Sequence, residues 1–175
     1  MFFKRHLKQG REIGQNTLAM LKSASMGTSF ESFDGFSPPS DFYNDAYING
    51  FLTSYVGNAM AFGLGANSWS REKKGECIYS AFSEIDPTNI LHKGLIREIE
   101  LDQAELERGL NDGTTVMGLT YQKLKSDDPD PKVIEAKKLA EELANQQAGS
   151  SPDEHLAAAA LLVTIRQHIQ SKWGR

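Results

Sequence analysis

Apolar and polar residues recur with a helical period between residues 41 and 64. With a step of four residues, this segment separates into an aromatic, an aliphatic, a small and a polar row. Because three adjacent rows can be buried, we predict a helix at the centre of a bundle, with the polar row wetted. The rows are Tyr43, Tyr47, Phe51, Tyr55 and Ala59; Ile48, Leu52, Val56 and Met60; Ala46, Gly50, Ser54 and Asn58; and Asp45, Asn49, Thr53 and Gly57.

The small row has its own consequence. A glycine within a helix costs about 1 kcal/mol relative to alanine, so Gly50 predicts that a neighbouring helix packs closely against this one. Residues 104–125 loosely repeat the pattern when Gly109 is aligned with Gly50. We expect a second close-packing helix there, although Asn111, Asp112 and Gly113 could instead form a turn.

Capping residues mark the start of the other helices. Serine or aspartate, followed in places by proline, satisfies the free backbone donors at a helix start. Further helices are expected over residues 70–85, 86–99, 130–144 and 151–173, and Asp102 with Glu105 three residues on indicates a kink or a new helix start. Together with a length of 175 residues, which suits one domain, these segments predict an all-α fold. It is a single-domain bundle of about six to seven helices with a long extended N-terminal connection.

The chain divides into a basic amphipathic helix (1–23), an extended connection (24–40) and the helical bundle (41–175). The first segment carries +4, whereas the whole chain carries −4, which leaves −8 for the rest. Such a helix can pack on an acidic body, the interpretation we favour, or bind anionic lipid or nucleic acid. Its candidate contact residues are Lys4, Arg5, Lys8 and Arg11.

The connection contains Phe30, Phe33 and Phe36, which recur every third residue. This spacing places side chains along one edge of a polyproline-like strand. The rings can hold the loop against the bundle, or they can fill pockets on a partner protein, since aromatic anchors dominate many interfaces.

The last helix carries a regular apolar seam. Ala158, Leu162, Ile165, Ile169 and Trp173 step by three or four residues, which allows packing inside the bundle or against a second copy of the chain. Leu162, Ile169 and Trp173 are therefore candidate partner-binding residues.

Residues that could carry chemistry are sparse. The four histidines are scattered, and the single Cys77 excludes an internal disulfide framework and a cysteine zinc cluster. No catalytic, metal or cofactor set is predicted. Cys77 alone favours a reducing, cytoplasmic location, and no apolar stretch reaches the roughly 20 residues of a membrane span.

Polar residues in the central helix allow one alternative. Asp45, Asn49, Tyr55 and Asn58 could line a ligand pocket if they are buried together, whereas on a wetted row they have no special role.

These features favour a non-catalytic, cytoplasmic protein-binding module, such as an adaptor, an inhibitor, an immunity factor or a complex subunit. Its partner would be another protein or a second copy of itself. The alternatives are a helical bundle that binds or processes a small molecule near Asp45, Asn49 and Tyr55, and a peripheral binder of anionic lipid or nucleic acid.

Overall fold

The computed structural model describes residues 4–28, 30–32, 35–147 and 150–174. Its α-helices are α1 (Arg5–Ala24), α2 (Ala46–Asn58), α3 (Arg71–Ile85), α4 (Ile90–Leu95), α5 (Gln103–Thr120), α6 (Pro131–Gln146), α7 (Pro152–Leu161) and α8 (Gln167–Trp173). Shorter elements are the strands β1 (Glu31–Ser32) and β2 (Gly35–Phe36), the 3-10 turns η1 (Phe42–Asn44) and η3 (Ala66–Ser68), and the π-helical turns η2 (Ala59–Gly63) and η4 (Leu162–Arg166). Because η4 joins α7 to α8 without a break, the described residues form seven helical rods, and the predicted all-α bundle is confirmed.

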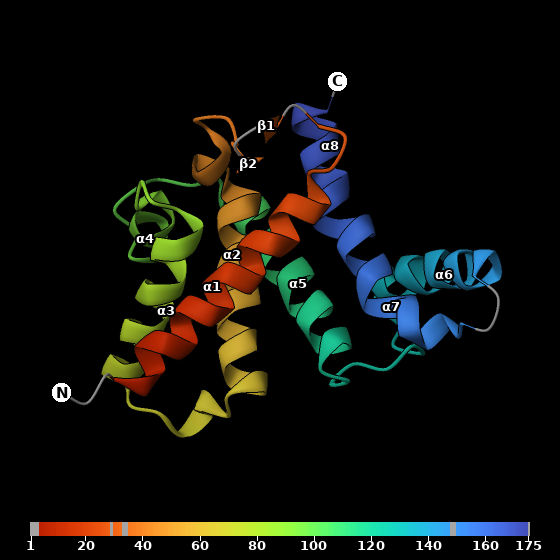
Figure 1. Cartoon of the computed structure of the whole chain (residues 1–175), viewed down its shortest axis with the longest axis horizontal. Coiled ribbons are helices and arrows are strands. Elements are labelled where there is room, and N and C mark those ends of the chain that lie inside the picture. Colours follow the sequence, from red (N-terminus) through yellow and green to blue (C-terminus); the bar gives the residue numbers. More distant parts are fainter. Residues whose placement is uncertain (1–3, 29, 33–34, 148–149, 175) are drawn as a thin grey trace.

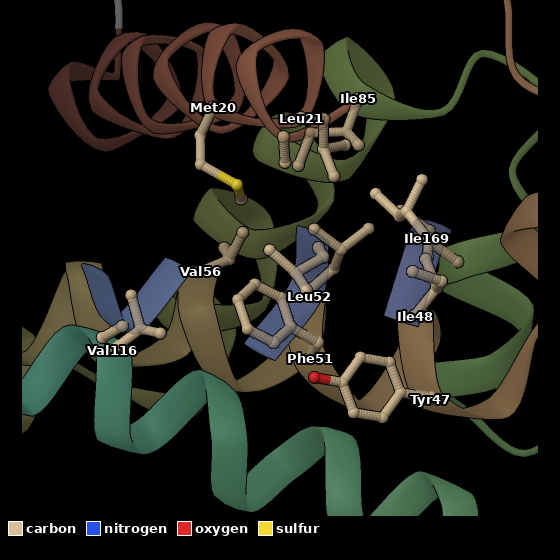
Figure 2. Close-up of a cluster of buried hydrophobic side chains, with 14 of the residues drawn as sticks. Met20, Leu21, Tyr47, Ile48, Phe51, Leu52, Val56, Ile85, Val116 and Ile169 are labelled. Carbon is tan, nitrogen blue, oxygen red and sulfur yellow. The ribbon is translucent and has the colours of Figure 1, made fainter. Parts of the chain in front are cut away.

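The helices pack as three close pairs, α1 with α3, α2 with α5, and α6 with α7 (Figure 1). Helix α2 lies at the centre, and its aromatic and aliphatic rows meet residues from α1, α3, α5 and α8 (Figure 2). Phe51 and Leu52 are fully buried there. Each such side chain contributes about 1.5–3 kcal/mol through burial, so this cluster is the main core of the protein.

Close approach of α2 and α5 depends on the predicted small residues. A Cβ atom added to Gly50 would lie 2.2 Å from the carbonyl oxygen of Leu106, and one added to Gly109 would lie 2.1 Å from that of Tyr47. The glycines that resembled each other in sequence therefore face the backbone of the partner helix. Helix α5 continues through Gly113 without a turn.

Helices α1 and α3 also approach each other closely at glycine residues. A Cβ atom on Gly14 would lie 2.5 Å from the carbonyl oxygen of Ala81, and Gly10 lies similarly against Cys77. These two glycines fit the interface between α1 and α3, which explains why a helix with two interior glycines is stable in this position.

Several predicted helix starts are confirmed by their caps. The carboxylates of Asp102 and Asp130 accept hydrogen bonds from the backbone nitrogens of Glu105 (2.9 Å) and Lys132 (2.7 Å). Others differ from prediction. The central helix begins at Ala46, after η1, and α4 begins only at Ile90, because Asp86 accepts from the backbone nitrogen of Thr88 in the preceding turn as well as from that of Leu91 in α4.

The prediction of a wetted polar row on α2 is wrong at two positions. Asp45 is 9% exposed and Asn49 is 1% exposed. Helix α4 covers Asn49, because Gly94 lies directly against its amide, where a Cβ atom would come within 2.6 Å of the amide oxygen, whereas Asp45 is contacted by His168 and Lys172 of α8. Each of these short polar side chains is thus buried beneath a neighbouring helix.

The predicted long extended connection is also wrong. Helix α1 occupies Arg5–Ala24, and the segment between α1 and α2, where the extended connection was expected, folds back as the antiparallel pair β1–β2. Phe30 is 1% exposed, and its ring centroid lies 5.4 Å from that of Phe42 and 5.7 Å from that of Trp173. The described part of this connection is therefore anchored to the bundle, whereas Phe33 lies outside the described residues.

The predicted C-terminal seam is displaced by the π-helical turn η4. Ala158 is exposed and Leu162 is half-buried, whereas Ala160, Thr164, Ile165 and Ile169 are buried. The buried positions step by five from Ala160 to Ile165 and from Thr164 to Ile169. A π turn inserts one residue into the helix, and this rotates the part before it relative to the part after it.

None of the helices in the described ranges combines the length and the apolar run that crossing a bilayer requires.

Candidate functional site

A network of polar side chains joins the start of α2 to α5 and α8. Asp45 lies at its centre, because its carboxylate caps α2 by accepting from the backbone nitrogen of Ile48 at 2.8 Å. The same carboxylate lies 3.1 Å from Nε2 of His168 and accepts from Nζ of Lys172 at 2.6 Å. Two residues of the C-terminal helix are thereby tied to the first turn of the central helix.

These contacts decide the charge of Asp45. Burial disfavours the ionised carboxylate, but the hydrogen bonds from His168 and Lys172 outweigh it and lower the pKa of Asp45 to about 2. Asp45 is therefore an anion at neutral pH, and it is compensated by Lys172.

The proton on His168 follows from its other neighbour. Nη2 of Arg108 lies 3.0 Å from Nδ1 of His168. Because a guanidinium group only donates, Nδ1 must accept, which leaves the ring proton on Nε2, where it is donated to Asp45. Both ring nitrogens of His168 are consequently occupied by protein groups.

Tyr47 packs against both His168 and Arg108. Its ring stacks on His168 with centroids 4.0 Å apart, and the guanidinium of Arg108 lies 4.3 Å from the tyrosine centroid. The phenol donates to Oδ2 of Asp112 at 2.7 Å. Burial, together with the charge of Asp112, raises the pKa of Tyr47, and burial also raises the pKa of Asp112. We call Asp45, Tyr47, Arg108, Asp112, His168 and Lys172 the polar network.

Two depressions open to solvent flank His168. One, of about 300 Å³, is bordered by Asp45, Lys172 and acidic residues of the α4–α5 connection and α5. The other, of about 210 Å³, is bordered by Arg108, Asp112 and Lys132. In the second, Nζ of Lys132 donates to the carbonyl oxygen of Val163 at 2.9 Å, so this cation too is held by the protein.

The four residues of the predicted ligand pocket are not brought together. Asp45 belongs to the polar network, and Asn49 is buried under α4 with no hydrogen-bond partner for its Nδ2. Asn58 donates to Oγ of Ser54 (3.1 Å) at the other end of α2, about 20 Å along the helix from Asp45. Tyr55 stacks on Phe51 and faces a different part of the surface.

That part is an apolar groove of about 270 Å³ between α1, α2 and α7. Leu162, a predicted partner-binding residue, forms part of its wall and is half-buried. Apolar side chains dominate the lining, and Arg166 is the only charged residue among the described residues that line it. We call this surface the apolar groove; it is lined by Met20, Ser23, Ala24, Tyr55, Ala158, Leu161, Leu162 and Arg166.

The other predicted partner-binding residues lie elsewhere. Phe30 and Ile169 are in the core and present no surface to a partner. Phe36 and Trp173 are half-buried against Phe42, with ring centroids at 5.9 Å and 5.3 Å.

The basic residues of α1 are largely paired. Lys4 contacts Glu76 of α3, Arg11 lies 4.0 Å from Glu84 of α3, and Lys8 lies 3.7 Å from Glu12. Arg5 is exposed. This helix thus packs on acidic residues of its neighbour, and its positive charge is partly neutralised.

Sequence reasoning missed the polar network. His168 and Lys172 are four residues apart and therefore share one helix face, which was the available signal. Their partner Asp45 lies 123 residues away from His168, and no local pattern connects the two.

Comparisons of the chain with protein-family models, curated proteins and solved structures find no match.

Proposed function

We propose that this protein is a non-catalytic, cytoplasmic protein-binding module that docks its partner in the apolar groove. The observation that carries the proposal is the groove itself, where the half-buried Leu161 and Leu162 leave apolar surface open to water between α1, α2 and α7. Contiguous exposed apolar surface costs free energy until a partner covers it. A flexible methionine in the wall suits a surface that adapts to a side chain inserted between helices.

The state of the polar network supports a non-catalytic role. A general base needs a free lone pair directed at a substrate, whereas Nδ1 and Nε2 of His168 face Arg108 and Asp45. The phenol of Tyr47 is likewise committed to Asp112. The network instead fixes α8 against α2 and α5, and it thereby holds η4, which forms one wall of the groove.

Two other observations favour protein binding over the alternatives. The polar residues expected to line a small-molecule pocket are distributed along α2, as described above. Three of the four basic residues expected to bind phosphates, Lys4, Lys8 and Arg11, lie within ion-pair distance of glutamates, and each such pairing reduces the attraction to a polyanion.

The test is affinity capture from the native cells with two matched variants. Leu162→Glu places a charge in the groove, and Ile134→Glu places the same charge at a 59% exposed isoleucine on α6, away from the groove. We expect a defined protein to be retained by the wild-type protein and by Ile134→Glu but lost from Leu162→Glu. Circular dichroism establishes that both variants are folded.

If Leu162→Glu retained every protein that the wild-type chain retains, the groove would not be the docking surface and the proposal would be wrong.

A further inference from the structure

The shape of the apolar groove limits what can occupy it. Its long wall runs from Ala158 to Arg166, which is about 12 Å, or roughly two helical turns. Ala158 is exposed and small, and it lines the groove together with Leu161, Leu162 and Met20 of α1. A shallow apolar channel between two helices suits the side chains of a third helix, inserted at positions i, i+3 or i+4, and i+7.

The charge of the groove is one-sided. Arg166 lies at the η4 end, and no acidic residue contributes to the lining. Within the described ranges, no carboxylate lies within ion-pair distance of its guanidinium, whereas six other lysine and arginine side chains have such a partner. A partner that covers the groove meets this charge beside its apolar contacts, so complementarity calls for an acidic side chain.

A second copy of the chain does not offer the required helix. The large hydrophobic side chains that are exposed in the described residues lie on or beside five different helices, so no helix presents two of them as a stripe. These residues are Met26, Tyr79, Ile96, Tyr121 and Ile134.

We infer that the occupant of the groove is an amphipathic α-helix of another protein, with two or three apolar residues on one face and an Asp or Glu placed to pair with Arg166. This inference rests on the proposed function and names the kind of partner that the groove selects. The apolar face supplies affinity, and the pair with Arg166 sets the direction in which the helix lies.

The experiment uses a phage-displayed library of helix-forming peptides of about 16 residues, roughly four turns, selected against the full chain. Selection on the wild-type protein is expected to enrich apolar residues at i, i+3 or i+4, and i+7 together with Asp or Glu. Selection on Arg166→Glu is expected to replace that acidic residue by Lys or Arg. Arg71→Glu is the matched control, since Arg71 is exposed at the start of α3 and lies outside the groove.

Affinities of the enriched acidic peptide are then measured by fluorescence anisotropy. Charge reversal at Arg166 should weaken binding roughly tenfold, because attraction becomes repulsion at a partly exposed pair, and reversal at Arg71 should change it less than about twofold. Ala158→Gln, a polar substitution at an exposed helical site, should block the groove and abolish binding without disturbing the core.

Three results would overturn the inference. One is enrichment of sequences that favour extended or proline-rich conformations, or of none. Another is an acidic preference that persists on Arg166→Glu. The third is a Leu162-dependent dimer in sedimentation experiments, which would make a second copy the occupant. In the first two cases, loss of the captured protein from Leu162→Glu would leave the proposed function standing.

Discussion

Replacement of Gly50 by alanine tests the close packing of α2 against α5. The added Cβ atom would lie 2.2 Å from the carbonyl oxygen of Leu106 and 3.1 Å from the backbone nitrogen of Leu110. Both atoms belong to the backbone of a helix, which cannot rotate aside as a side chain can. The two helices must therefore move apart by about 1 Å to reach an ordinary contact distance of roughly 3.4 Å or more.

The size of the effect follows from two opposing contributions. Alanine favours the helix by about 1 kcal/mol relative to glycine, whereas overpacking of a well-filled interface costs about 1–3 kcal/mol or more. Separation of the helices also loosens Tyr47 and Phe51, which flank Gly50 and are fully buried. After the gain is subtracted, we expect the free energy of unfolding to fall by up to about 2 kcal/mol, out of roughly 5–15 kcal/mol for a domain.

Gly57 provides the control in the same helix. A Cβ atom at Gly57 would meet nothing within 4 Å, so Gly57→Ala should raise the free energy of unfolding by about 0.5–1 kcal/mol. Both variants are compared with the wild-type protein by urea denaturation followed by circular dichroism, with equal m-values as the condition for comparison. If Gly50→Ala proved as stabilising as Gly57→Ala, the close approach of α2 and α5 would be refuted.

Two further predictions concern the contacts of the C-terminal helix. The pKa of Asp45 is lowered from 3.8 to about 2 in the folded protein, so its ionisation contributes about 2 kcal/mol of stability at pH values above the unfolded pKa, and this is lost as the pH falls towards 2. Asp45→Asn should therefore lower the free energy of unfolding at pH 7 and flatten its dependence on pH between about pH 2 and 5. Asp153→Asn, at an exposed position, should do neither. If denaturation experiments found the same pH dependence for Asp45→Asn as for the wild-type protein, the assigned contacts of Asp45 would be wrong. Trp173→Ala removes the ring that packs against Phe30 and Phe42 and should lower the free energy of unfolding by about 1–3 kcal/mol. Limited proteolysis should then cleave the segment 25–41 faster in Trp173→Ala than in the control Trp69→Ala. Equal cleavage rates would show that other contacts hold the β1–β2 pair.

The sequence by itself determined most of the helices and the aromatic and aliphatic rows that α2 buries. Caps such as Asp102 and Asp130 act on backbone groups two or three residues away, and the apolar rows of α2 repeat every four residues. Both are interactions between near neighbours in the chain, so they can be read without knowledge of the fold. Gly50 also predicted close packing. A glycine within a helix lowers stability, and close packing of a neighbouring helix compensates this loss.

Only the tertiary structure decided which distant residues meet. Asp45 was predicted to be wetted, but His168 and Lys172 of α8 contact it, and its contact with His168 joins segments 123 residues apart. The π-helical turn η4 changes which residues of the last helix are buried, and it places Leu162 and Arg166 in the apolar groove. The physical reason is that such contacts depend on the relative placement of whole helices, which is set by packing throughout the core and leaves no local trace in the sequence.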